Sequence, residues 1–117
     1  MTVRRLKTYA GSQGYVYQYY FVGKRPAADF PEATEYIFDV TSDRKLTYSV
    51  SVLFPRSVVL RWAEIHRRGL SDSEQYAAVK LRLFLAFDEV EDMQADGRQL
   101  LIDEPFLEEA LPSLGVE

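Results

Sequence analysis

The chain has 117 residues, of which 47% are hydrophobic, 14% aromatic and 27% charged, and its formal net charge is −4. This length and composition are typical of one globular domain that buries a core without covalent staples. The chain contains no cysteine, which excludes disulfides, thiolate metal sites and cysteine nucleophiles.

The two halves of the chain differ in charge. Residues 1–68 carry eleven Lys/Arg against six Asp/Glu, whereas residues 69–117 carry three against twelve. Such asymmetry is typical of halves, or copies, that attract each other, and also of chains with an anionic partner or an acidic tail. It bears on association more than on fold.

The N-terminus has no apolar run of the signal-peptide kind, and the longest apolar-rich helical stretch is interrupted by Lys80 and Arg82. We therefore expect a soluble, cytoplasmic protein with no membrane partner.

Two strands are predicted first in the chain. Residues 3–10 form an imperfect strand, and Gly11 to Gly14 form a hairpin turn. The Tyr-rich stretch at 15–22 follows, with aromatic residues at every second position on one face. We expect Gly23 to Pro26 to end this strand, and residues 27–33 to form a loop that Phe30 anchors.

A second hairpin is predicted at 34–54. Tyr36, Phe38 and Val40 share one face of the strand at 34–41, and residues 42–44 form a polar turn. The strand at 45–54 has the clearest alternation in the chain, with five apolar side chains on one face: Leu46, Tyr48, Val50, Val52 and Phe54.

Two helices follow. The first opens after Pro55 and ends at Gly69, with an apolar stripe that consists of Val58, Val59, Trp62 and Ile65. The second begins at a capping box formed by Ser71 and Glu74 and ends near Met93. Its stripe runs from Tyr76 to Val90 and is widened by Leu81, Phe84 and Ala86.

The last part of the chain, residues 95–117, is predicted as an acidic C-terminal arm. Within it, residues 98–102 are a short fifth strand or an extended piece, and Pro105 opens either a short helix at 106–111 or an irregular tail.

These elements predict a single α+β domain over residues 1–117. Its antiparallel sheet has four to five strands, most simply in a meander, and two helices pack on one face of that sheet.

The sheet face opposite the helices is the candidate interaction surface, since a contiguous apolar patch there would mark a binding site. The residues assigned to the interaction surface, with a basic pair on the first helix, are Tyr15, Tyr17, Tyr19, Phe21, Lys24, Arg25, Arg61 and Arg68. The alternatives for the tyrosines are the core or the interior of a dimer.

No catalytic or metal constellation is found. His66 is the only histidine, and nothing near it has the spacing of a zinc motif or designates a nucleophile. Asp88 and Asp92 are four residues apart in an acidic run, but the spacing of a calcium loop is absent. A solvated helix face is the leading interpretation, and a compensating cation from another element is favoured over a metal. No residue set resembles a known family, and no cofactor is predicted.

The leading interpretation is a non-enzymatic protein-interaction module whose partner is another protein or a second copy. The first alternative is a protein that binds single-stranded nucleic acid through its aromatic and basic residues. The second alternative is a small-ligand carrier with a pocket lined by Tyr36, Tyr48 and Trp62.

Overall fold

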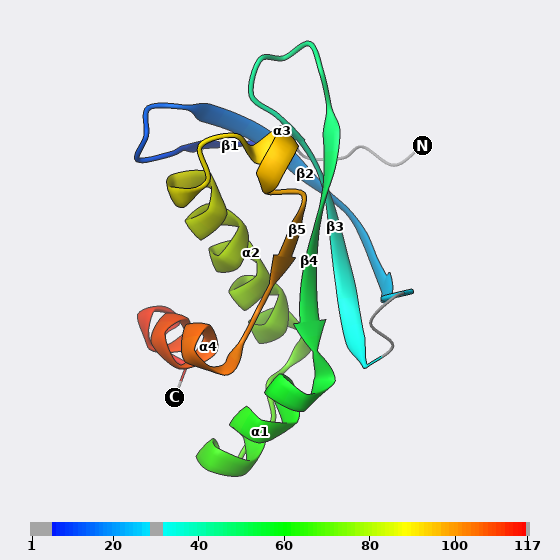
Figure 1. Cartoon of the computed structure of the whole chain (residues 1–117). Helices are drawn as coiled ribbons and strands as arrows, with labels where there is room; N and C mark the ends of the chain where they lie inside the picture. Colours follow the sequence, from blue (N-terminus) through cyan, green and yellow to red (C-terminus); the bar gives the residue numbers. More distant parts are fainter. Residues whose placement is uncertain (1–5, 29–31, 117) are drawn as a thin grey trace.

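The computed structural model describes residues 6–28 and 32–116. Figure 1 shows a twisted sheet with helices against one of its faces. The elements, in chain order, are β1 (Lys7–Ala10), β2 (Val16–Pro26), β3 (Ala33–Thr41), β4 (Tyr48–Pro55), α1 (Arg56–His66), α2 (Asp72–Glu89), α3 (Met93–Asp96), β5 (Gln99–Leu101), α4 (Glu104–Ala110) and the 3₁₀ helix η1 (Leu111–Leu114).

The sheet has the order β1-β2-β3-β4-β5, and the α+β prediction is confirmed. Strands β1 to β4 form the expected antiparallel meander. Strand β5 instead pairs with β4 in parallel, so the sheet is mixed. The reason is the connection: three helices separate the two strands, and such a crossover returns the chain in the same direction.

Strand β2 runs through the stretch from Gly23 to Pro26 that was predicted to end it, and stops only at Pro26. A register shift between Phe21 and Gly23 inserts one extra residue, and such a bulge suits a glycine. The next amide, that of Ala27, donates to the Ala33 carbonyl on the β3 side. The nitrogen of Pro26 therefore faces away from β3. Because no ladder hydrogen bond is needed on that side, proline is tolerated there although it lacks an N–H. Phe30, the expected loop anchor, lies outside the described residues.

Strand β4 begins at Tyr48, three residues later than predicted. Its inward face is otherwise as expected, because Tyr48, Val50, Val52 and Phe54 are all buried. Leu46 is 50% exposed and lies in the β3–β4 connection, where the Asp43 carboxylate accepts from the Lys45 and Leu46 amides. These bonds extend the turn to Leu46, so the turn contains more residues than the alternation of side chains indicates.

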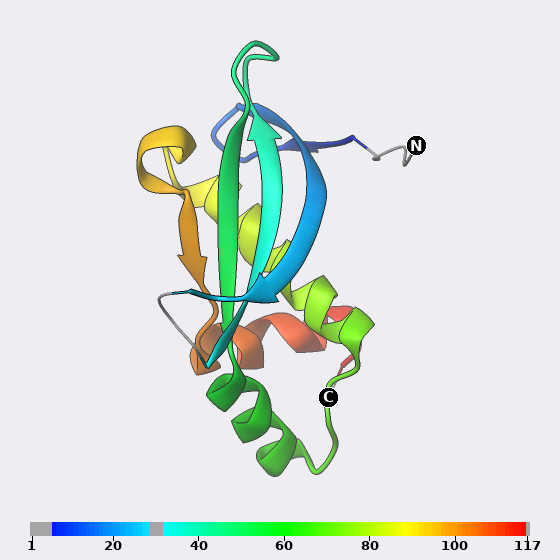
Figure 2. The same ribbon diagram turned by 90° about the vertical axis from the view of Figure 1, so that its right-hand side faces the viewer.

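Helix α2 lies across one face of the sheet and closes the core (Figures 1 and 2). Val79, Leu83 and Phe87, at helical spacing, are fully buried against the strands. The predicted capping box is confirmed, since Ser71 and Glu74 exchange side-chain and backbone hydrogen bonds. The helix ends at Glu89, short of Met93, because Val90 adopts an extended conformation and Asp92 caps the separate turn α3.

The prediction placed both long helices on one face of the sheet, but α1 does not lie beside α2 there. It continues from the end of β4 and projects beyond the sheet (Figures 1 and 2). Only Val58 and Trp62 of this helix are buried, and the predicted core residue Ile65 is 56% exposed. The helix ends at Arg67, which adopts the left-handed conformation two residues before the expected glycine.

The segment from residue 95 onward is not an extended arm. Leu100, Ile102, Leu107, Leu111 and Val116 belong to the main core cluster. Residues 99–101 form β5, and Asp103 caps α4 by accepting from the Phe106 amide, with Pro105 in the first turn. Three of its acidic residues, Glu104, Glu108 and Glu109, are exposed on α4.

The start of α2 predicts a pH dependence. Arg68 and the Ser71 amide, in that order, lower the pKa of Glu74 to about 2 from an ordinary 4.5. A carboxyl with a depressed pKa stabilises the fold above pH 4.5, and this contribution disappears as the pH falls toward 2. We expect urea unfolding midpoints across this window to fall further for the wild type than for Glu74→Gln. Parallel curves for the two proteins would contradict the assignment.

In the described part of the chain, no helix is long and apolar enough to cross a membrane.

Candidate functional site

The predicted tyrosine surface is divided between core and surface. Tyr17 and Tyr19 are only 2% and 4% exposed, and Tyr17 stacks on Phe87 of α2 with ring centroids 4.2 Å apart. Phe21 is half-buried against Tyr76, whereas Tyr15 is 45% exposed at the turn. The face that carries these rings is therefore the covered face, and the rings of Tyr17 and Tyr19 are inaccessible to bases.

The uncovered face of the sheet, hereafter the open face, is largely polar. Arg25 donates to Glu35 at 2.8 Å, and the Ser51 hydroxyl donates to the same carboxylate at 2.6 Å. These bonds lower the pKa of Glu35, with the Ser51 bond the larger cause. The Tyr20 hydroxyl also donates to Asp39 at 2.6 Å. Because these groups satisfy one another, this part of the open face is suited to water, while Val16 and Val22, 50% and 37% exposed, lie on the same face of β2.

The predicted basic residues are scattered. Lys24 lies over the Tyr36 ring at 5.8 Å, on the covered side of the sheet. Arg61 is 3.8 Å from Glu64 on exposed helix surface, a geometry of little energetic weight. Arg68 makes a two-pronged contact with Glu74 and stands over Trp62 at 5.3 Å. The eight predicted residues do not converge on one site.

The pocket expected between sheet and helices is filled. Tyr36 and Trp62 are each 2% exposed within the core, Trp62 borders only a small hollow of about 50 Å³ between α1 and α4, and Tyr48 borders a separate opening. His66 stacks on Trp62 at 4.2 Å and contacts Glu108 of α4 at 2.9 Å. This histidine therefore helps to join α1 to α4.

The acidic run is held by neutral donors rather than by the expected cation. Asp88 accepts from the Tyr9 hydroxyl at 2.8 Å and from the Ser12 amide at 2.9 Å. Both donors belong to the β1–β2 hairpin, which Asp88 thereby fixes on the end of α2. Among the described residues, no group of three or more acids or histidines is arranged to hold a metal ion.

A groove that the sequence did not predict runs between α2 and α4, of about 470 Å³, and we call it the α2–α4 groove. Its lining is Tyr9, Leu81, Phe84, Leu85, Asp88, Glu89, Phe106, Glu109 and Ala110. The floor is apolar and the rim carries three carboxylates without a cation. Lys80 and Arg82 stand near it, over the rings of Phe84 and Phe106. Leu81 and Phe84 had widened the predicted stripe of α2, which was the signal for an apolar surface outside the core.

The exposed side of α1 is a second surface of note. Leu60 and Ile65 are 53% and 56% exposed and flank an arc of the helix that also holds Arg61. Arg56 and Arg67 are exposed at its two ends, against one acid, Glu64. Counted over the whole helix, Arg56, Arg61 and Arg67 outnumber Glu64, although Arg61 pairs with Glu64 and Glu104 of α4 borders the same surface.

Comparison of the chain with protein-family models, with curated proteins and with solved structures found no match.

Proposed function

We propose that the protein is a self-associating interaction module in which α1 of one copy docks into the α2–α4 groove of another. The observation that carries this proposal is the complementarity of two surfaces of one chain. The groove has an apolar floor and an acidic rim, and α1 offers apolar side chains with basic ones among them. An amphipathic helix in an apolar groove is a common mode of protein recognition.

The charges support this pairing over others. Glu89 and Glu109 are exposed on the rim of the groove, while Arg56, Arg61 and Arg67 are exposed on α1. Opposite charges that meet across an interface speed association and reject wrong partners. The same distribution accounts for the basic first half and acidic second half of the sequence.

The shape of the molecule also supports it. Helix α1 projects from the end of the domain, and the groove lies on the flank formed by α2 and α4 (Figure 1). A reciprocal exchange of the two helices closes into a dimer, whereas a one-way contact grows into a chain of copies. The helix is short, so we expect a small and weak interface.

Light scattering over a concentration series tests the proposal. Between about 1 μM and 1 mM, which brackets weak association, we expect the mass to rise from 13.5 kDa to twice that value. Ile65→Glu places a charge at the apolar contact and is expected to keep the protein monomeric. Because Ile65 is 56% exposed, the substitution should leave the unfolding midpoint within experimental error.

The matched control is Leu46→Glu, a similar change at a 50% exposed leucine in the β3–β4 connection. This variant should associate as the wild type does. A wild type that stays at 13.5 kDa throughout, or an effect of Leu46→Glu equal to that of Ile65→Glu, would refute the proposal.

A further inference from the structure

A second groove, of about 500 Å³, lies at the other end of the domain, where β2 begins and α3 follows α2. We call it the tyrosine groove, and its lining is Tyr15, Tyr17, Ser42, Tyr48, Glu91, Asp92, Met93, Gln94 and Asp96. Three of these residues are carboxylates, and none is a cation. It shares no lining residue with the α2–α4 groove.

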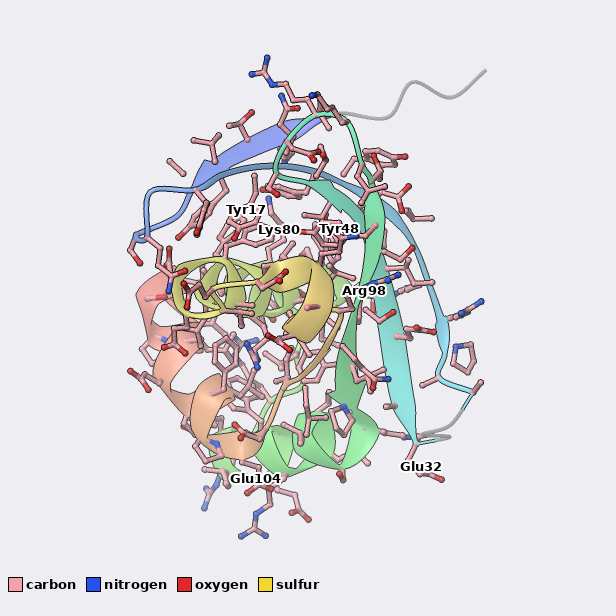
Figure 3. The ribbon with its side chains drawn as sticks, turned by 45° about the horizontal axis from the view of Figure 1, so that its top comes forward. Tyr17, Glu32, Tyr48, Lys80, Arg98 and Glu104 are labelled. Carbon is pink, nitrogen blue, oxygen red and sulfur yellow. The ribbon has the colours of Figure 1, made fainter. Side chains whose placement is uncertain are left out.

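Two buried phenols open onto the tyrosine groove. Tyr17 and Tyr48 are 2% and 7% exposed, and Figure 3 shows both beside the α3 turn. Within the described part of the chain, neither hydroxyl has a hydrogen-bond partner, although both border the groove. No side-chain nitrogen or oxygen of the described residues is both fully buried and without a partner, so these two hydroxyls reach the opening and offer their hydrogen-bonding atoms to a bound group.

Burial and the neighbouring charges determine whether these two hydroxyls are protonated. Burial first, and then the neighbouring Tyr17 and Asp92, raise the pKa of Tyr48 to about 12, while Arg98 opposes them. Burial, with Tyr15 and Asp92, also raises the pKa of Tyr17. Both phenols are therefore neutral at physiological pH, and each keeps one O–H donor and free lone pairs.

The position of Arg98 leaves the groove negative. Its Nε atom donates to the Ser49 carbonyl oxygen at 3.0 Å, and the residue does not line the groove. The Asp92 carboxylate uses one oxygen to accept from the Ala95 amide. Glu91 and Asp96 are exposed at the margin.

We infer that the tyrosine groove binds an organic cation that carries N–H donors, namely a primary ammonium or a guanidinium group. Its N–H groups donate to the phenol oxygens of Tyr17 and Tyr48, and the carboxylates balance its charge. The exposed ring of Tyr15 at the same opening favours a cation as well. A hard metal ion suits the groove poorly, because its acids do not converge into a ligand cluster among the described residues.

Calorimetric titration with agmatine, which carries both a guanidinium and a primary ammonium group, tests this inference. Tyr17→Phe and Tyr48→Phe keep the rings and remove only the hydroxyls. We expect each variant to bind agmatine about tenfold more weakly, as befits a lost hydrogen bond to a charged group. Tyr76→Phe, which removes a hydroxyl outside the groove, is the matched control and should bind as the wild type does.

A second measurement locates the site. In amide NMR spectra, agmatine should shift the resonances of residues 91–96 and of Tyr17, and tetramethylammonium, a cation without N–H donors, should shift them much less. No agmatine binding, wild-type affinity in both Tyr→Phe variants, or equal responses to the two cations would each overturn the inference. The outcome is independent of self-association, because Ile65→Glu should bind agmatine unchanged.

Discussion

Replacement of Phe87 by alanine is expected to lower the free energy of unfolding by about 3–5 kcal/mol, the usual cost of emptying an aromatic site in a core. Phe87 is completely buried and stacks on Tyr17, and its ring also contacts Tyr9 and Tyr19. The loss is a large part of the stability of a domain of this size.

Urea denaturation followed by circular dichroism measures this loss. Tyr15→Ala is the comparison, because it removes an aromatic ring from the same strand region at a 45% exposed position. We expect that change to cost less than about 1 kcal/mol. If the two variants lost equal stability, the covered face of β2 would have been misassigned.

The replacement of Trp62 by alanine should be nearly as costly, again about 3–5 kcal/mol, but with a different consequence. Trp62 is 2% exposed and is one of two buried residues of α1. Its ring stacks on His66 and lies beneath Arg68. Without it, α1 keeps only Val58 as a buried anchor, and we expect the helix to open locally.

Amide hydrogen exchange separates local opening from a general loss of stability. The amides of α1 should lose protection in Trp62→Ala by a larger factor than those of β3, which lies at the centre of the sheet. His66→Ala, which removes the stacked ring and the contact with Glu108, should have the same pattern with a smaller amplitude. Uniform loss of protection across the domain would contradict this account of α1.

The strands and the start of α2 were predictable because local patterns decide them. The alternation at Tyr48, Val50 and Val52 requires a strand with one buried face, and Ser71 with Glu74 defines the helix start. The end of β2 was not predictable, because the bulge before Gly23 and the free direction of the Pro26 nitrogen depend on how β3 pairs.

The candidate site was harder to predict because it depends on which face is covered. The Tyr-rich strand is apolar on both sides, so its period of two could not show that Tyr17 faces α2 while Tyr20 faces solvent. Ile65 likewise follows the helical period of Val58 and Trp62, yet it is 56% exposed. Both grooves are lined by residues that are distant in sequence; the α2–α4 groove, for example, brings Tyr9 together with Phe106. A local sequence pattern cannot predict such a contact.

Mixing two charge-reversed variants tests most directly the proposed contact between α1 and the α2–α4 groove of another copy. One variant carries Arg61→Glu with Arg67→Glu on α1, and the other carries Glu89→Arg with Glu109→Arg on the rim. Like charges should keep each variant monomeric when alone, because they face each other across every contact.

In the mixture, every contact has opposite charges again, either native or doubly reversed. Sedimentation velocity should therefore find dimers in the mixture and monomers in each separate sample. Dimers in the separate samples, or monomers in the mixture while the wild type associates, would contradict the proposed contact.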